Sequence, residues 1–171
     1  MTILVSILTI SDRASRQERP DTSGPTLLRL IEEYGWMVAR SAIIPDEYDQ
    51  IVQILSEWCD AGITDIILTT GGTGFSPRDV TPEATQAVIQ KLTPGISEFM
   101  RIESLKITPH AMLSRGTAGI RNKTLIINLP GSPKAVVENL RIILPILPHA
   151  VELLHDSPTA EAGHQYPENF S

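Results

Sequence analysis

Four short polar segments of the chain carry the residue types that could act on a phosphate-bearing substrate. The largest is the glycine-rich segment at residues 71–79, GGTGFSPRD. The other three are SDRAS at 11–15, PDE at 45–47 and PGSPK at 130–134. Together they supply carboxylates, hydroxyls, basic side chains and closely spaced glycines, which is the set of groups that a nucleotide and a divalent cation require.

The glycine-rich segment is a candidate phosphate-binding loop. Gly71, Gly72 and Gly74 can adopt positive φ and let backbone amides approach a ligand closely, and Arg78 could add a guanidinium fork. Neither standard phosphate motif is present, because no lysine follows the loop and Pro77 stands where a dinucleotide-binding loop has its third glycine. From spacing alone, a structural turn and a phosphate-binding loop are equal alternatives.

Asp46 and Asp79 are the candidate metal ligands. Each follows a predicted strand or a loop attached to one, so the two carboxylates could converge if those strands are parallel neighbours. Two carboxylates beside a polyphosphate are the usual means of holding Mg²⁺, which keeps several of its waters. Taken singly, Asp46 is better explained as a helix N-cap, and Asp79 as a turn acid paired with Arg78.

The elements that must position these residues alternate between strands and helices. Short apolar runs predict strands at residues 2–10, 37–44, 65–70 and 124–129. This order predicts a three-layer α/β/α fold with a mostly parallel sheet. In such a sheet ligands gather at the carboxyl ends of the strands, where all four polar segments would lie.

Helix signals lie between these strands. Helices are expected to begin near Pro25, Asp46, Thr81 and Thr93, with Thr81 as a cap, and a last one covers residues 135–153. Pro145 and Pro148 should break or kink the last helix. Residues 106–121 show no clear pattern, and no element is predicted there.

Length and composition restrict the class of protein. The 171 residues fit one domain at residues 1–155, followed by a polar tail at 156–171 that is expected to be disordered. A net charge of −6 argues against a nucleic-acid surface. No apolar run is long enough to span a membrane, and the first residues lack the basic start of a secretory signal, which favours the cytoplasm. The lone Cys59 excludes an internal disulfide.

The same segments, taken in order, resemble the molybdenum-cofactor biosynthesis proteins. GGTGFSPRDVTPEAT at 71–85 resembles their signature. It is accompanied by SDRAS at 11–15, DTSGP at 21–25, PDE at 45–47, ESLKITPHAMLSR at 103–115, AGIR at 118–121 and INLPGSPKA at 127–135. Over residues 3–154 the chain is similar to the bacterial MogA-type molybdopterin adenylyltransferases and to the G domains of the plant enzyme and of gephyrin.

The resemblance implies an activity and a set of site residues. Members of this family assemble as trimers and transfer AMP from Mg²⁺–ATP to the terminal phosphate of molybdopterin, releasing pyrophosphate. Asp46 and Asp79 match the essential acids, which would hold Mg²⁺ transiently. The residues expected to bind the nucleotide are Gly71, Gly72, Thr73, Gly74, Ser76 and Arg78. The residues expected to bind molybdopterin are Ser11, Asp12, Asp21, Ser23, Gly24, Ser114, Pro130 and Gly131.

The resemblance also leaves alternatives. The plant and animal relatives carry a molybdenum-inserting domain in the same chain, so here a separate enzyme is expected to insert the metal in trans. One rival function is a molybdopterin-binding or scaffold homologue without transferase activity, although the presence of both Asp46 and Asp79 argues against it. A second rival is a Mg²⁺-dependent nucleotide hydrolase.

Overall fold

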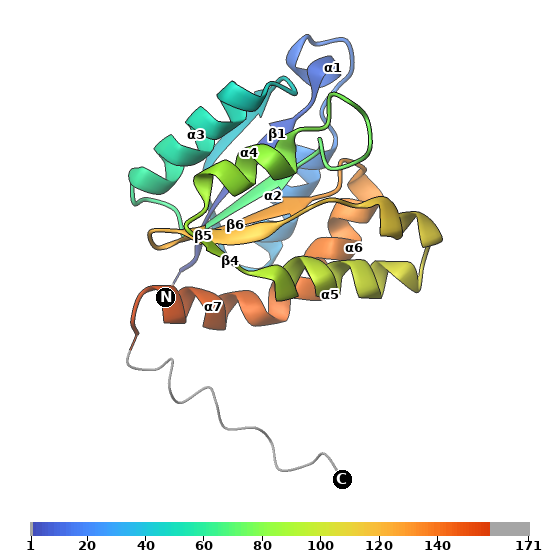
Figure 1. The fold of residues 1–171 in the computed structure, drawn as a ribbon. Coiled ribbons are helices and arrows are strands. Elements are labelled where there is room, and N and C mark those ends of the chain that lie inside the picture. The colour runs from blue at the N-terminus through green and yellow to red at the C-terminus, as the bar shows by residue number, and fades with distance from the viewer. Residues whose placement is uncertain (1, 158–171) are drawn as a thin grey trace.

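A six-stranded sheet lies between two layers of helices in the computed structural model, which describes residues 2–157 (Figure 1). Its strands are β1 (Leu4–Ile10), β2 (Met37–Ile44), β3 (Ile66–Thr70), β4 (Lys91–Leu92), β5 (Ala118–Arg121) and β6 (Thr124–Leu129). They are ordered β2-β1-β3-β6-β5-β4; the pairs from β2 to β6 are parallel, and β5 is antiparallel to both of its neighbours. The expected three-layer α/β/α fold with a mostly parallel sheet is confirmed.

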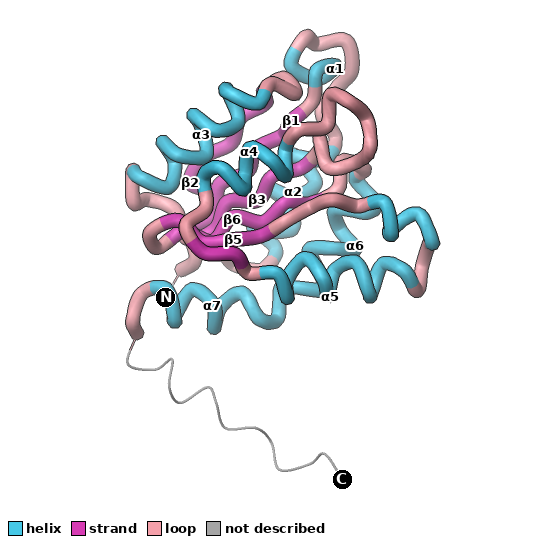
Figure 2. The backbone as a smooth tube through the Cα atoms, viewed as in Figure 1, coloured by secondary structure: helices cyan, strands magenta, loops and turns pink. Residues whose placement is uncertain are grey.

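Helices cover both faces of the sheet (Figure 2). One face packs against α3 (Tyr48–Asp60) and α4 (Thr81–Val88). The other packs against α2 (Ser23–Glu33), α5 (Pro94–Leu105), α6 (Pro133–Ile143) and α7 (Leu147–Leu154). The remaining elements are the short helix α1 (Asp12–Ser15) and two 3₁₀ helices, η1 (Pro109–Leu113) and η2 (Leu144–Ile146). None of the helices in the described part of the chain is long and apolar enough to cross a membrane.

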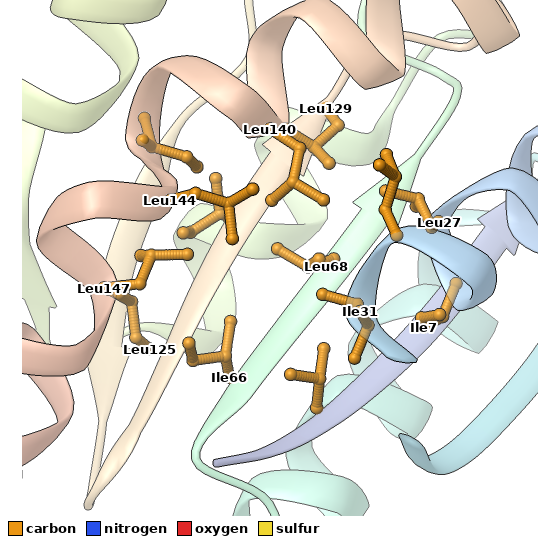
Figure 3. Close-up of a cluster of buried hydrophobic side chains, with 14 of the residues drawn as sticks. Ile7, Leu27, Ile31, Ile66, Leu68, Leu125, Leu129, Leu140, Leu144 and Leu147 are labelled. Carbon is orange, nitrogen blue, oxygen red and sulfur yellow. The ribbon is translucent and has the colours of Figure 1, made fainter. Parts of the chain in front are cut away.

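The central strands are buried on both sides, as their mostly apolar sequences predict. Alternate residues of β1 point to opposite faces, so that Ile7 joins the core beneath α2 and α6 while Leu8 joins the core beneath α3 and α4. Figure 3 shows the larger of the two clusters, in which Leu68 of β3 lies among leucine and isoleucine side chains of the helices. The edge strand β2 instead alternates between exposed and partly buried residues.

The last helix and the unassigned residues 106–121 take their final form from their neighbours in the fold. The prolines at 145 and 148 do break the last helix, because α6 ends at Ile143, η2 follows, and α7 begins at Leu147. Residues 106–121 form η1 and β5, and β5 pairs with the unpredicted two-residue strand β4. Strands this short have no periodicity to detect. They exist because β6 pairs with β5, and β5 in turn pairs with β4.

The strand order places the four polar segments together, but it does not make the strands before Asp46 and Asp79 neighbours, which was the condition set for their convergence. The parallel register aligns the carboxyl ends of β1, β2, β3 and β6, so the segments that follow them share one edge of the sheet. However, β2 and β3 are not neighbours, because β1 lies between them.

The predicted domain limit at 155 stays a prediction, and the expected tail at 156–171 lies almost wholly outside the described residues.

Candidate functional site

Two pockets open on either side of the glycine-rich loop at the carboxyl edge of the sheet. The first, here called the acidic pocket, has a volume of about 240 Å³. Its lining includes Ser11, Asp21, Ser23, Asp46, Gly71, Gly72, Asp79 and Gly131. The second, here called the α5–α6 pocket, has a volume of about 290 Å³. Its lining includes Thr73, Gly74, Met100, Arg101, His110, Ser114, Pro130 and Glu138.

At Gly71 and Gly74 the backbone of the glycine-rich loop lies close to neighbouring atoms that a side chain would meet. Gly71 has φ of +101°, and a β-carbon there would lie 2.2 Å from the carbonyl oxygen of Ile10. A β-carbon on Gly74 would lie 2.9 Å from Oδ2 of Asp79. The glycines therefore bring the loop backbone against the end of β1 and against a carboxylate of the acidic pocket. A plain surface turn would not require this close approach.

Asp46 reaches the acidic pocket through a reciprocal contact with the loop after β1. Its Oδ2 accepts a hydrogen bond from the amide of Asp12 at 2.8 Å, and its own amide donates to Oδ1 of Asp12 at 3.2 Å. This pairing connects the loops after β1 and β2, and it explains how Asp46 lies beside the glycine loop although β1 separates the strands. Asp46 is not a helix N-cap, since α3 starts at Tyr48 with Glu47 in the cap position.

The charge of Asp46 is only partly compensated. Burial raises the pKa of the Asp46 carboxyl above its usual value, and the nearby carboxylates of Asp12 and Asp79 raise it further, against the lowering effect of the Asp12 contact and of Arg78. An ionised Asp46 is therefore less favourable in the folded protein than in the unfolded chain. A bound cation would relieve this repulsion.

We expect Asp46→Asn to be at least as stable as the wild type near neutral pH. The pKa of Asp46 is higher in the folded protein than in the unfolded chain, so the protonated form of Asp46 favours the folded state. This contribution to stability is lost as the pH rises through the pKa that Asp46 has in the folded protein. An asparagine oxygen can still accept the bond from Asp12. Urea unfolding from about pH 3 to about pH 7 should show the variant's relative stability increasing with pH. The exposed Asp49→Asn is the matched control, and parallel pH profiles for Asp46→Asn and wild type would contradict this account.

Asp79 is held by its own loop and by Arg115. Its Oδ2 accepts from the amide of Ser76 at 2.9 Å. Arg115 donates from its guanidinium to the carbonyl oxygen of Gly74 at 2.7 Å and to the carbonyl oxygen of Asp79, and it also pairs with Glu83 in the first turn of α4. Arg115 therefore holds the glycine-rich loop at two of its backbone carbonyl groups. No sequence pattern singled it out, although it follows Ser114 in a segment that carries the family resemblance.

Arg78 does not point into either pocket. Its guanidinium donates twice to Asp12, with both distances 3.0 Å, and once to Glu47 at 2.7 Å. The suggested pairing of Arg78 with Asp79 is therefore wrong, and the partner is Asp12 because the loops after β1 and β3 face each other. The hydrogen bond from Arg78 lowers the pKa of Asp12. Ser76 and Arg78 are exposed, and their contact with a nucleotide stays a prediction.

Hydrogen bonds between loops shape the floor of the acidic pocket. Asp21 accepts from the hydroxyl of Thr9 at 2.7 Å and from the amides of Ser23 and Gly24 at 3.0 and 3.1 Å. The Ser23 hydroxyl donates to the carbonyl oxygen of Gly131 at 2.8 Å. The start of α2 is thereby joined to the loop after β6, so residues more than a hundred positions apart line one pocket.

The residues expected to hold molybdopterin are divided among several places. Ser11, Asp21, Ser23 and Gly131 line the acidic pocket with both candidate metal ligands. Ser114 and Pro130 instead line the α5–α6 pocket. Gly24 lines a separate hollow between α2 and β2, and Asp12 lines neither named pocket. A single pocket containing Ser23, Gly24 and Ser114 is therefore not what the fold provides, because the glycine-rich loop lies between the two named pockets.

The donor set of the acidic pocket suits Mg²⁺. All of its candidate ligands are oxygens, which Mg²⁺ prefers, and two carboxylates leave room for waters and phosphate oxygens. Within residues 2–157 no group of three or more His, Cys, Asp or Glu side chains could hold a metal ion by itself. Cys59 lies buried in α3, and burial raises its pKa to about 12, so its thiol takes no part in this chemistry.

Comparison with known proteins gives one consistent family. Residues 6–149 match the family model described as "Probable molybdopterin binding domain". The Drosophila melanogaster molybdenum cofactor synthesis protein cinnamon is 50% identical over 155 residues, which cover 90% of this chain and 26% of that protein. The molybdopterin adenylyltransferase of Helicobacter pylori strain J99 is 46% identical over 90% of this chain and 88% of its own length.

A solved structure is similar along nearly its whole length. The molybdopterin biosynthesis enzyme MoaB from Thermus thermophilus superposes with a TM-score of 0.86 at 46% identity, covering 92% of this chain and 99% of its own. This chain thus spans nearly all of the Thermus protein and about a quarter of the length of cinnamon.

Proposed function

This chain belongs to the molybdopterin-binding domain family of molybdenum-cofactor biosynthesis, and from that premise we propose that it is a molybdopterin adenylyltransferase. It transfers AMP from ATP to the terminal phosphate of molybdopterin and releases pyrophosphate. The observation that carries this proposal is the convergence of Asp46 and Asp79 in one pocket beside the glycine-rich loop.

The two pockets offer one place for each substrate. Gly71, Gly72 and Asp79 line the acidic pocket, whereas Thr73 and Gly74 of the same loop line the α5–α6 pocket. The acidic pocket, with its candidate metal ligands Asp46 and Asp79 and its close backbone, suits a metal-bound polyphosphate. The α5–α6 pocket is mainly apolar at its surface and suits a flat heterocycle, which we take to be the pterin of molybdopterin. The polyphosphate in one pocket and the pterin in the other would then approach each other across the glycine-rich loop.

The residues of the chain have defined tasks in this reaction. An oxygen of the molybdopterin phosphate attacks the α-phosphorus of ATP, the new P–O bond forms, and the bond to the leaving pyrophosphate breaks. Asp46 and Asp79 hold Mg²⁺, which when bound polarises the α-phosphate and neutralises charge. Backbone amides of residues 71–74 stabilise the charge that develops on the phosphate oxygens. No side-chain nucleophile is needed, because the substrate phosphate is the nucleophile.

One incubation separates this proposal from its rivals. The purified protein with molybdopterin, ATP and Mg²⁺ should give adenylylated molybdopterin and pyrophosphate in equal amounts. Binding of molybdopterin without formation of the adenylylated product would instead indicate a scaffold. Steady ATP turnover in the absence of molybdopterin would indicate a hydrolase.

The proposal includes an assembly and a setting. We propose a cytoplasmic homotrimer that passes its product to a separate molybdenum-inserting enzyme, as the sequence resemblance implies. Light scattering of the purified protein should give three times the mass of the 171-residue chain. A monomeric mass would contradict the trimer without affecting the assignment of the two pockets.

A further inference from the structure

The hydroxyl of Thr81 is an unexplained polar group that lies against Gly72, one of the residues that line the acidic pocket. Thr81 is completely buried, and its Oγ1 makes no hydrogen bond within the described part of the chain. Its expected role as a helix cap is wrong, because Thr81 is the first residue of α4 and Val80 occupies the cap position. Buried hydroxyls without a partner destabilise a fold and are uncommon, so this one calls for a reason.

The position of Gly72 shows where the hydroxyl lies. A β-carbon on Gly72 would lie 2.2 Å from Oγ1 of Thr81 and 3.0 Å from Oδ1 of Asp46. Both oxygens are therefore on the same side of the Gly72 backbone, where the missing side chain leaves them close to each other. The amide of Thr81 also donates to the carbonyl oxygen of Gly72 at 3.1 Å, which fixes the start of α4 against the loop.

The oxygen of Asp46 that faces Thr81 is the one left available for a ligand. Oδ2 of Asp46 accepts the bond from the Asp12 amide, whereas no hydrogen bond to Oδ1 is found among residues 2–157. The close contacts of the Gly72 backbone with Thr81 and Asp46 are here called the Gly72 cradle. This cradle brings together an available carboxylate oxygen and an unpartnered hydroxyl. This pair resembles in its chemistry the hydroxyl and carboxylate oxygens that commonly accompany Mg²⁺ beside nucleotide phosphates.

We propose that the Thr81 hydroxyl is a further oxygen ligand, direct or through one water, of the Mg²⁺–nucleotide complex in the acidic pocket. This proposal rests on the proposed function and adds a residue to its site. Gly72 is then required for two reasons: its positive φ turns the loop, and its missing side chain lets Thr81 and Asp46 face the same ligand.

The variant Thr81→Val tests this directly, because valine keeps the shape of threonine and replaces the hydroxyl with a methyl group. Binding of Mn²⁺ together with α,β-methylene-ATP is measured by calorimetry and by the electron paramagnetic resonance of the metal. We expect Thr81→Val to weaken metal–nucleotide binding by about ten- to a hundredfold. Its unfolding midpoint in urea should stay equal or rise, because a buried unpaired hydroxyl is removed. Thr81→Ser should restore most of the binding.

Thr93→Val is the matched control. Thr93 Oγ1 is the other buried hydroxyl without a partner in the part of the chain that the structure describes, and Thr93 precedes α5, whereas Thr81 lies against Gly72. Its valine variant should bind Mn²⁺ and the nucleotide analogue like the wild type.

The outcomes distinguish this proposal from the proposed function. Wild-type affinity in Thr81→Val, or a loss of stability that accounts for its weaker binding, would overturn the role of Thr81 while the wild type still transfers AMP. Binding that depends on Thr81 in a protein that transfers no AMP to molybdopterin would instead leave Thr81 as a ligand and remove the transferase activity.

Discussion

Replacing Asp79 with alanine is expected to slow AMP transfer by about a thousandfold, which corresponds to about 4 kcal/mol in the activation barrier. Asp79 is one of the two candidate metal ligands in the acidic pocket, and its side chain also accepts a hydrogen bond from the Ser76 amide inside the glycine-rich loop. The substitution removes a metal ligand and a loop contact, whereas the α5–α6 pocket is left intact. Affinity for molybdopterin should therefore change little. Single-turnover formation of adenylylated molybdopterin measures the rate, and fluorescence titration measures the affinity.

Asp79→Asn separates the two effects of the alanine variant. An asparagine oxygen can still accept from the Ser76 amide, so the loop is kept while the negative charge is lost. A rate as low as that of Asp79→Ala would assign the effect to metal binding. The exposed Asp49→Ala in the first turn of α3 is the control for net charge and should transfer AMP normally. Transfer at the wild-type rate in Asp79→Ala would remove Asp79 from the metal site.

Gly72→Ala should lower AMP transfer by about a hundredfold, because displacing reacting groups by about 1 Å has effects of that size. The added methyl group would lie 2.2 Å from Thr81 Oγ1, so the loop or α4 must shift. The same group would lie 3.0 Å from Asp46 Oδ1, so it would crowd both oxygens that we propose as ligands. Metal–nucleotide affinity and transfer should fall together, and both are measured with Mn²⁺ in place of Mg²⁺.

Gly62→Ala distinguishes this steric effect from backbone strain. Gly62 follows α3 with φ of +66°, close to the +63° of Gly72, and has no atom within 4 Å of an added β-carbon. Alanine there should reduce the free energy of unfolding by about 1 to 2 kcal/mol through strain alone and leave transfer unchanged. If Gly62→Ala and Gly72→Ala lost the same stability and neither lost transfer, the steric account of the Gly72 cradle would be wrong.

The acids at this edge of the sheet fall into two groups with different tasks. Asp12 and Glu47 are paired with the guanidinium of Arg78, which joins the three loops after β1, β2 and β3. Asp46 and Asp79 form no salt bridge with an arginine or lysine among the described residues, and both face the acidic pocket. One arginine therefore organises the rim, whereas Asp46 and Asp79 are left available for a cation. The third carboxylate of the pocket, Asp21, accepts hydrogen bonds from Thr9, Ser23 and Gly24. Because Arg78 has this structural task, it need not contact phosphate although it lies in the glycine-rich loop.

The sequence by itself determined the architecture and placed the candidate site at one edge of the sheet. Short, mostly apolar runs identify β1, β3 and β6, because a strand buried on both faces has no solvent-facing polar side. Glycine and proline mark the ends of the elements, since few other residues adopt the required backbone angles. Once the sheet is taken as parallel, its carboxyl edge must contain all four polar segments. This much needs only local chemistry and the geometry of parallel strands.

Only the tertiary structure decided which partner each side chain has. Arg78 pairs with Asp12, 66 residues away, and Arg115 holds the carbonyl oxygen of Gly74, 41 residues away. Such pairings depend on how loops meet after the strands are ordered, and local patterns carry no information about that order. For the same reason the sequence could not divide Ser23 and Ser114 between two pockets. Nor could it reveal that the Thr81 hydroxyl is buried against Gly72, because this contact exists only when α4 packs on the loop.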